Sequence, residues 1–208
     1  MGAGPDNAPT MNPHPLQPDA KPVTEEQVQA AWVGELPRLA GRVEVRAYDP
    51  QWPHLYEREA ARLRGLLGER VLALDHVGST AVPGLPAKPI IDIDLSLADS
   101  ADEAAYRSLL EAAGYRLVVR EPDWHEHRMF KGPDTNINLH VWTLGSPEAA
   151  RHLIFRDWLR ANPEDRQRYG ELKLALSEQN FEYVHAYNNA KAPLIHAIYA
   201  RALAAGGL

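Results

Sequence analysis

Pro89-Ile90-Ile91-Asp92-Ile93-Asp94-Leu95 is the stretch that says most about how this chain folds. Its apolar residues are interrupted only by acids at alternate positions, which predicts a buried β-strand with one polar face. Successive strand side chains point to opposite faces, so Asp92 and Asp94 share a face and lie roughly 7 Å apart along the strand. An edge strand with two acids facing solvent is the plainer alternative. The flanking isoleucines favour a strand in the core.

Two carboxylates on one buried face need a compensating charge. Like charges at this separation raise each other's pKa and cost stability unless a cation neutralises them. Hard oxygen ligands select Mg²⁺ or Mn²⁺, which typically complete their coordination with water and substrate phosphates. The pair therefore predicts a metal site with Asp92 and Asp94 as ligands.

A glycine turn, Gly78-Ser79-Thr80, follows an apolar segment and precedes the acidic strand. Glycine lets the backbone approach a phosphate closely, and the neighbouring hydroxyl and N–H groups can donate hydrogen bonds to its oxygens. An ordinary Gly-Ser turn is the alternative, since such turns are common. In combination with the aspartate pair, the turn predicts a cradle for a triphosphate.

Along the rest of the chain, hydrophobic periodicity predicts a mixed sheet with flanking helices, an α/β (α+β) fold. The expected strands are residues 43–47, 71–77, 90–97, 115–119, 128–131 and 137–142. The expected helices are residues 24–36, 55–68 and 102–113, and helical spacing continues from 146 to 203. Three regions follow: a Pro-rich leader at 1–22 that we expect to be disordered, an N-terminal helix within 23–41, and a domain at 42–203.

The composition limits the classes of function. With 22 basic and 28 acidic residues, the formal net charge of -6 argues against a protein that coats long nucleic acid, and small anionic ligands held through metal fit better. The absence of cysteine excludes disulfides and thiolate zinc sites and indicates a reducing compartment. No apolar run approaches the roughly 20 residues that span a bilayer. We therefore expect a cytoplasmic protein without a membrane segment.

The segment 76–94 resembles the signature of the GrpB family, a branch of the polymerase-β-like nucleotidyltransferase superfamily. The resemblance covers roughly residues 42–203, with further matches at residues 48–53, 138–141, 155–157, 159–160, 169, 172–173 and 191. It implies a small palm with a mixed sheet, in which Gly78, Ser79 and the two aspartates stand where the superfamily binds triphosphate and metals. Related domains are fused to dephospho-CoA kinase in some bacteria, which implies a link to nucleotide or coenzyme metabolism.

One position departs from the superfamily pattern. Active members usually carry a third carboxylate on a later strand, as a metal ligand and as a base for the attacking hydroxyl. The corresponding segment here, residues 136–142, places Asn138 and His140 on one face and contains no acid. His140 can take the vacant place as a metal ligand or general base, and a hydrogen-bonded structural histidine is the alternative.

Several cations are candidates for binding phosphate. Lys88, Arg128 and Lys131 lie on or near the expected strands. Four further candidates lie on C-terminal helices, which in the superfamily often close over the nucleotide: Arg156, Lys173, Tyr187 and Lys191. Exposed charges that only add solubility are the alternative for each.

These residues lead to two main hypotheses. The first is an enzyme that transfers a nucleotidyl group from a Mg²⁺-bound nucleoside triphosphate to a small acceptor, with Asp92, Asp94 and His140 as catalytic residues. The alternative is a catalytically inactive module of the same fold that binds a nucleotide or coenzyme. A scaffold with a vestigial pocket is a third reading. The nucleotide, the acceptor and the oligomeric state are left open.

Overall fold

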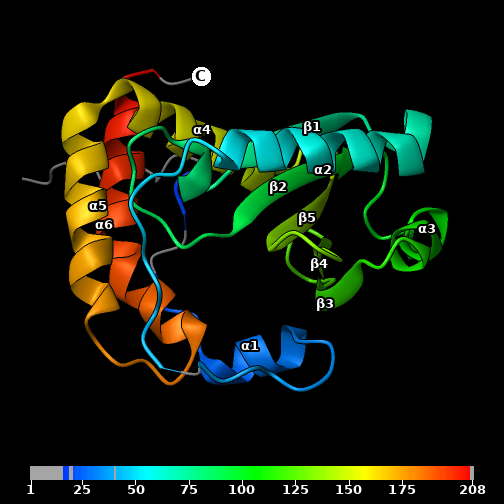
Figure 1. The fold of residues 1–208 in the computed structure, drawn as a ribbon, viewed down its shortest axis with the longest axis horizontal. Coiled ribbons are helices and arrows are strands. Elements are labelled where there is room, and N and C mark those ends of the chain that lie inside the picture. Colours follow the sequence, from blue (N-terminus) through cyan, green and yellow to red (C-terminus); the bar gives the residue numbers. More distant parts are fainter. Residues whose placement is uncertain (1–15, 19–20, 40, 207–208) are drawn as a thin grey trace, which may run out of the picture.

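The computed structural model describes residues 16–18, 21–39 and 41–206. Within this part of the chain, five strands form one mixed sheet in the order β1-β2-β5-β4-β3, and six α-helices surround it (Figure 1). The strands are β1 (Ala73–Val77), β2 (Ile91–Leu97), β3 (Arg116–Glu121), β4 (His127–Lys131) and β5 (Ile137–Thr143). The helices are α1 (Glu25–Ala31), α2 (Trp52–Leu67), α3 (Arg107–Ala112), α4 (Pro147–Ala161), α5 (Pro163–Ser177) and α6 (Val184–Ala204). The predicted α/β class with a helical C-terminal third is confirmed.

The acidic strand, β2, lies inside the sheet, antiparallel to β1 and parallel to β5. Its register pairs Asp92 with Asn138 and Asp94 with His140. Paired residues on neighbouring strands point to the same face, so these four polar side chains share one face of the sheet. The opposite face of the two strands is apolar and at most 4% exposed, with Ile91, Ile93, Leu95, Leu97, Ile137, Leu139 and Val141.

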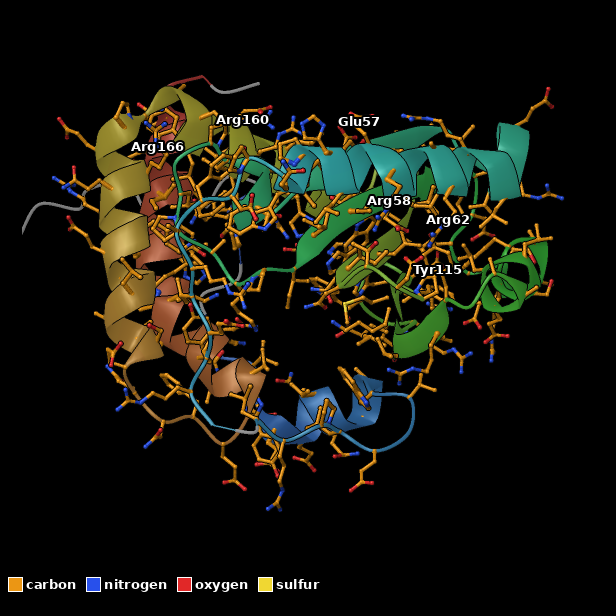
Figure 2. All side chains as sticks on the ribbon, viewed as in Figure 1. Glu57, Arg58, Arg62, Tyr115, Arg160 and Arg166 are labelled. Carbon is orange, nitrogen blue, oxygen red and sulfur yellow. The ribbon has the colours of Figure 1, made fainter. Side chains whose placement is uncertain are left out.

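The apolar face is covered by α2 and α3, whose Leu63, Leu67 and Leu110 are at most 1% exposed and belong to the same core cluster. The inner side of α2 also buries the carboxylate of Glu59. That group accepts hydrogen bonds from Tyr115 at 2.7 Å and from Thr135 at 2.8 Å. Figure 2 shows Tyr115 beneath α2. These hydrogen bonds offset the cost of burying the carboxylate. They also connect α2 to Tyr115, directly before β3, and to Thr135 in the loop between β4 and β5.

Helices α4, α5 and α6 pack together and support the loop between β1 and β2. From α4, Arg156 donates a hydrogen bond to the carbonyl of His76 at 3.1 Å, and Arg160 donates two to the carbonyl of Ala81 at 2.8 and 3.0 Å. Gly170 of α5 faces Pro86 so closely that an added Cβ would lie 3.1 Å from its ring. In the described part of the chain, no helix is long and apolar enough to cross a membrane.

The N-terminal helix is shorter than the sequence indicates. The predicted capping box of Thr24 and Gln27 is present, but α1 ends at Ala31 instead of near Leu36. Trp32 is extended and forms an antiparallel bridge with Val119 of β3. Pairing with the sheet edge therefore replaces the last expected turn of the helix.

Residues 43–47 do not form the expected strand of the sheet. Only Arg46 makes a bridge, with Ala87. The alternation has another origin, because Val43 packs against Leu176 and Tyr187 of the C-terminal helices.

The Pro-rich leader lies mostly outside the described residues. Of the part that is described, Leu16 packs beside Ile154 and Tyr199, and its carbonyl accepts a hydrogen bond from Arg151 at 2.9 Å.

Candidate functional site

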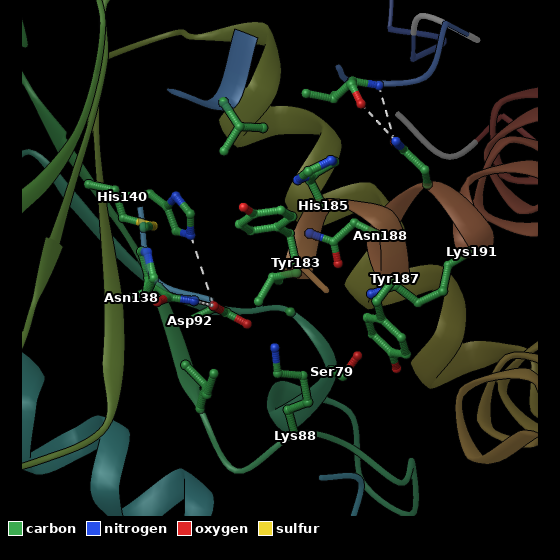
Figure 3. Close-up of a pocket in the computed structure, with 18 of the residues that line it drawn as sticks. Ser79, Lys88, Asp92, Asn138, His140, Tyr183, His185, Tyr187, Asn188 and Lys191 are labelled. Carbon is green, nitrogen blue, oxygen red and sulfur yellow. Dashed lines mark hydrogen bonds and ion pairs between the residues drawn. The ribbon is translucent and has the colours of Figure 1, made fainter. Parts of the chain in front are cut away.

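A cavity of about 600 Å³ lies on the polar face of the sheet (Figure 3). Its walls come from the β1–β2 loop, from β1, β2, β4 and β5, and from α4, α5 and α6. The N-terminal segment adds an apolar roof of Val23, Val28, Trp32, Leu36 and Pro37. Three parts of the chain that are distant in sequence therefore enclose one space.

Asp92 lines the cavity, and its surroundings favour the ionised carboxylate. Asn138 donates a hydrogen bond to Asp92 Oδ1 at 2.7 Å, and Lys131 donates one to Asn138 Oδ1 at 2.5 Å. Burial acts to raise the pKa of Asp92, but His140, Asn138 and the nearby His152 together hold it below its usual value. Asp92 is thus an anion within reach of a ligand.

Asp94 has different surroundings although it shares the face. It is 3% exposed and does not line the cavity. Trp142 Nε1 donates to Asp94 Oδ1 at 3.0 Å, and His152 Nδ1 lies 2.9 Å from Oδ2. Burial opposes the charged imidazole, but the Asp94 carboxylate raises the pKa of His152 above its ordinary value. Asp94 is therefore engaged in anchoring His152 of α4 to the sheet.

The glycine turn lies against Asp92. Gly78 has φ 68°, and a Cβ added there would lie 2.3 Å from Asp92 Oδ2. Ser79 lines the cavity beside it. The Thr80 hydroxyl is committed within the protein, because it donates to the carbonyl of Ile90 at 3.1 Å and contacts His76 Nε2 at 3.1 Å. The turn and Asp92 are brought together as predicted, and the close approach that requires glycine is to the carboxylate.

The cavity collects almost all of the lysines of the chain. The sequence contains five, at positions 21, 88, 131, 173 and 191, and the last four line the cavity. Lys191 lies 4.4 Å from the ring centre of Tyr187, and Lys173 lies 4.6 Å from that of Tyr169. Asp92 is the one carboxylate among the described lining residues, so the wall carries an excess of positive charge.

Burial and mutual repulsion lower the pKa of these lysines. Burial lowers the pKa of Lys191 to about 8, and repulsion from Lys88 adds to this effect while Asp92 opposes it. Burial also holds the pKa of Lys173 well below its usual value, and repulsion from Lys191 lowers it further. The pKa values of Lys88 and Lys131 are also lowered, mainly by burial. The free cavity is therefore an unfavourable place for so many ammonium groups.

Three buried polar atoms in the cavity wall have no hydrogen-bond partner among the described residues. They are Lys173 Nζ, Tyr187 Oη and His185 Nδ1. Such groups cost free energy unless water or a ligand satisfies them. Lys173 is 3% exposed and Tyr187 is 1% exposed, and both line the cavity, so bulk solvent has little access to either side chain.

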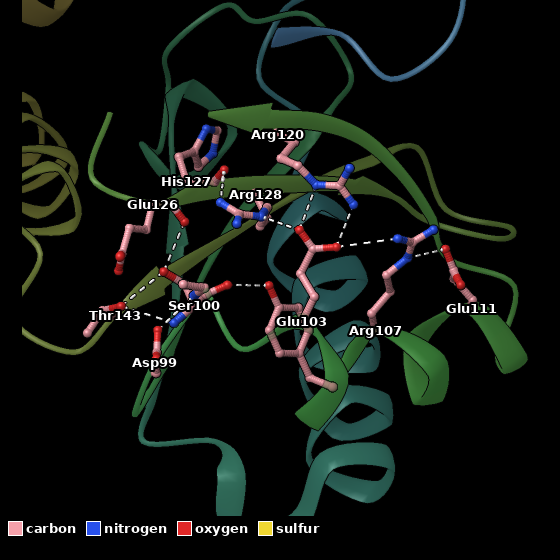
Figure 4. Close-up of polar contacts among 12 residues, drawn as sticks. Asp99, Ser100, Glu103, Arg107, Glu111, Arg120, Glu126, His127, Arg128 and Thr143 are labelled. Carbon is pink, nitrogen blue, oxygen red and sulfur yellow. Dashed lines mark hydrogen bonds and ion pairs between the residues drawn. The ribbon is translucent and has the colours of Figure 1, made fainter. Parts of the chain in front are cut away.

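Arg128, which the sequence suggested as a phosphate ligand, does not line the cavity. It is paired with Val141 across β4 and β5 and so points to the apolar face. There its guanidinium donates to Glu103 at 2.6 Å, in a network with Arg120 and Arg107 (Figure 4). The structure therefore gives Arg128 a partner in the fold on the far side of the sheet.

The side chains around Asp92 and Asp94 do not form the donor set expected for Mg²⁺ or Mn²⁺. Among the described residues, no three His, Cys, Asp or Glu side chains are grouped as metal ligands. Asp94 is hydrogen-bonded on both oxygens, and His140 Nε2 lies 3.9 Å from Asp92 Oδ1. Four lysines around Asp92 would also repel a dication. The residues present do not fit the two-aspartate metal site that the sequence predicted.

The comparison with known proteins identifies the family. The model of the family described as GrpB protein matches residues 42–201. The chain belongs to the GrpB family. A UPF0157 protein of Halalkalibacterium halodurans is 50% identical over 184 residues, which are 88% of this chain and 94% of that protein. The crystal structure of the conserved protein GrpB from Enterococcus faecalis has a TM-score of 0.68 at 31% identity, and the match covers 79% of this chain and all of that one.

This GrpB-family chain also matches part of a longer protein. The dephospho-CoA kinase of Mycolicibacterium paratuberculosis is 32% identical over 180 residues, which are 74% of this chain and 44% of the kinase. The roof residues before position 42 lie outside the family match, yet they line the cavity.

The sequence did not single out every residue of the cavity in this GrpB-family chain. His152 was missed, because nothing in its helix shows that it meets Asp94. The roof was missed, since an isolated amphipathic segment does not reveal its partner. The sequence does contain a signal for the lysines. Of the 22 basic residues 17 are arginine, so the five lysines stand out as a distinct set of positions.

Gly78→Ala should lower the free energy of unfolding more than Gly84→Ala. Both glycines have positive φ, 68° and 79°, so each alanine costs on the order of 1–3 kcal/mol of backbone strain. Only at position 78 does the new Cβ collide with Asp92, since position 84 opens on empty space. Urea unfolding of both variants measures the difference. In an Asp92→Ala background the extra cost at position 78 should shrink, and equal costs at 78 and 84 would contradict the close approach.

Stability should depend on pH through Lys191. Because its folded pKa of about 8 is below its unfolded value near 10.5, the unfolded state binds more protons between these limits. The contribution of Lys191 to stability therefore rises as pH increases through this window. In urea unfolding from about pH 7 to pH 10, the free energy of unfolding of wild type should rise relative to that of Lys191→Met. Lys191→Arg, which stays charged, should show no such gain, and parallel curves for wild type and Lys191→Met would contradict the assignment.

Proposed function

We propose that the cavity binds a small molecule that carries several phosphate charges, of the nucleotide or coenzyme type. The observation that carries the proposal is the convergence of four of the five lysines on one enclosed space. The formal charge of the whole chain is -6, so this accumulation runs against the general composition. A compact polyanion would satisfy Lys173 Nζ and Tyr187 Oη and relieve the repulsion among the ammonium groups.

Phosphate fits this wall better than a single carboxylate does. Each ammonium group is a compact charge with three donors, and four of them around one aspartate leave an excess that a monoanion cannot balance. The Ser79 hydroxyl adds a neutral donor at the turn. Phosphoryl groups offer several acceptor oxygens on one centre, which such a set of donors can share.

The roof supports a second, apolar part of the ligand. Val28, Trp32 and Leu36 face the cavity, and Met129 and Tyr183 line it as well. Ligand pockets of this size typically combine apolar walls with a few placed polar groups. The match to part of a dephospho-CoA kinase supports the same ligand class, since nucleotides and coenzymes join phosphate to a planar base.

Nucleotidyl transfer to a small acceptor is the second candidate function. The contact of the Gly78 turn with Asp92 favours it, because the resemblance to the nucleotidyltransferase superfamily implies a triphosphate there. It ranks second because Asp94 is occupied by Trp142 and His152, and no third carboxylate replaces it in the described cavity wall. Adding Mg²⁺ or Mn²⁺ to the binding experiment separates the two candidates.

Lys173→Met should stabilise the free protein and weaken ligand binding. The substitution removes a buried amine whose Nζ has no hydrogen-bond partner among the described residues, so the melting temperature without ligand should rise. A hydrogen bond to a charged group contributes about 1.5–3 kcal/mol, so affinity should fall by about tenfold or more. Thermal unfolding with tripolyphosphate, ATP or dephospho-CoA in EDTA measures both effects.

Wild type at about a hundred times the dissociation constant should gain roughly 2.7 kcal/mol, or roughly 2–4 °C. Lys21→Met, outside the cavity wall, is the matched control and should bind like wild type. If none of the three compounds stabilises wild type, the phosphate-binding proposal fails. If stabilisation needs Mg²⁺ and pyrophosphate is released, nucleotidyl transfer takes first place.

Trp32→Ala should separate the two halves of the ligand site. The indole lies in the roof, so its loss should weaken ATP or dephospho-CoA and leave tripolyphosphate unaffected. Val33→Ala is the control, because Val33 is adjacent, 37% exposed and absent from the cavity wall. Isothermal titration measures each affinity. Equal losses for tripolyphosphate and ATP would show that the roof does not contact the apolar part of the ligand.

A further inference from the structure

The roof of the cavity is a strap of chain that connects two distant parts of the fold. It comprises residues 23–37, here called the roof segment, which run from α6 to β3 and include α1 (Figure 1). At the α6 end, the side chain of Asn189 accepts a hydrogen bond from Val23 N at 3.1 Å and donates one to Val23 O at 2.7 Å. Both hydrogen bonds are exposed, so water competes for them. This contact, here called the latch, is therefore weak enough to open.

At its other end the roof segment pairs with β3, the edge strand of the sheet. Trp32 forms an antiparallel bridge with Val119, and Val33 N donates to the carbonyl of Val118 at 2.9 Å. That hydrogen bond flanks the bridge, so Trp32 and Val119 are a non-hydrogen-bonded pair with Cα atoms about 4.5 Å apart. The roof segment is thus held at both ends, and its apolar side chains face the cavity between them.

The roof segment has little packing of its own. None of its residues is buried, and none belongs to the core clusters of the described residues. Its helix α1 has seven residues, and isolated helices shorter than about 12–15 residues are marginal in water. The capping box of Thr24 and Gln27 satisfies the first turn of α1 and adds no buried apolar contact. Segments with few buried contacts and exposed hydrogen bonds are the ones that open locally at least cost.

The other walls of the cavity are packed much more firmly. Ile93 of β2 and Leu139 of β5 are fully buried in the main core. Tyr169 of α5 and Ile198 of α6 are buried in a second cluster. A wall that moves to let a ligand pass loses the packing that holds it. The roof segment is therefore the wall whose movement costs least.

We propose that the roof segment is a lid, which opens at the latch and at the bridge to admit a ligand and closes again over it. Lys173 and Tyr187, which are at most 3% exposed, become accessible from solution when the lid is open. In the closed position Val28 and Trp32 cover the apolar part of the ligand. The opening is a property of the free protein, whereas closure over a phosphorylated ligand rests on the proposed function.

The opening is tested on the free protein with a thiol placed in the cavity. The chain contains no cysteine, so in Lys173→Cys the aromatic anion dithiobis(nitrobenzoate) can react only at position 173. The thiolate attacks the disulfide of the reagent, forms a mixed disulfide and releases one coloured thionitrobenzoate anion, which reports the rate. Adding Asn189→Ala removes both hydrogen bonds of the latch and should raise this rate about fivefold or more.

The matched control for the latch is Asn136→Ala in the same Lys173→Cys background. The Asn136 side chain also holds a backbone carbonyl, that of Pro89 at 3.2 Å, but it does not line the cavity. Its loss should leave the labelling rate unchanged. Equal rates with and without Asn189→Ala would show that the reagent reaches position 173 without the latch opening, and the lid would be refuted.

The closure is tested with a disulfide between the roof segment and β3. The separation of about 4.5 Å between the Cα atoms of Trp32 and Val119 lies within the range that a disulfide spans. Oxidised Trp32→Cys/Val119→Cys is locked shut and the reduced form is not, so comparing the two forms cancels the loss of the indole. Rapid mixing with ATP that carries a fluorescent group on its ribose should show association about tenfold slower, or more, in the oxidised form. Trp32→Cys alone, treated with the same oxidant, should show no change.

The two experiments separate the lid from the ligand class. Equal association rates for the oxidised and reduced double variant would overturn the lid even if ATP binds well. If ATP, tripolyphosphate and dephospho-CoA all fail to bind wild type, the phosphate-binding proposal is refuted, and the labelling rates of the free protein decide on the lid without it.

Discussion

The two-sided character of β2 is the constraint on which the rest of the structure depends. Its isoleucines and leucines are at most 4% exposed on one side and form the core with α2 and α3. The same strand must then bury acids on its other side, and buried carboxylates require donors. Asp94 meets this requirement through Trp142 and through His152 of α4. The position of the C-terminal helices is thus coupled to one polar contact, and the space beside it, around Asp92, becomes the cavity.

The positions of the five strands along the chain and the shared face of the acidic pair were predictable, because both follow from hydrophobic patterns within short segments; the order of the strands in the sheet was not. The different roles of Asp92 and Asp94 were not, since a strand pattern gives the face of a residue and not what packs against that face. Arg128 shows a related limit. Its face depends on the register between β4 and β5, which pairs it with Val141, and no local pattern states that register. The predicted strand at 43–47 failed for a similar reason, because packing of Val43 against helices produces the same alternation.

The division of labour between arginine and lysine follows from their shapes. Arg128, Arg156 and Arg160 are held by carboxylates or carbonyls within the fold, where a planar fork with several donors joins fixed acceptors. Lysine is a compact charge on a flexible stem, so it suits an anion of variable position such as the ligand we propose. The arginines connect elements to one another, whereas four lysines line the cavity.

The polar wall of the cavity destabilises the ligand-free protein. The lowered pKa values of the lysines indicate that burial and repulsion destabilise their charged forms. Lys173 Nζ and Tyr187 Oη also have no hydrogen-bond partner among the described residues, which costs further free energy. Binding sites with preset donors need less reorganisation when the ligand enters. On the opposite face of the sheet, α2 and α3 pack on the isoleucines of β2, and the burial of these apolar side chains offsets the destabilisation. The seven residues of β2 thus contribute to the apolar core on one side of the sheet and to the cavity wall on the other.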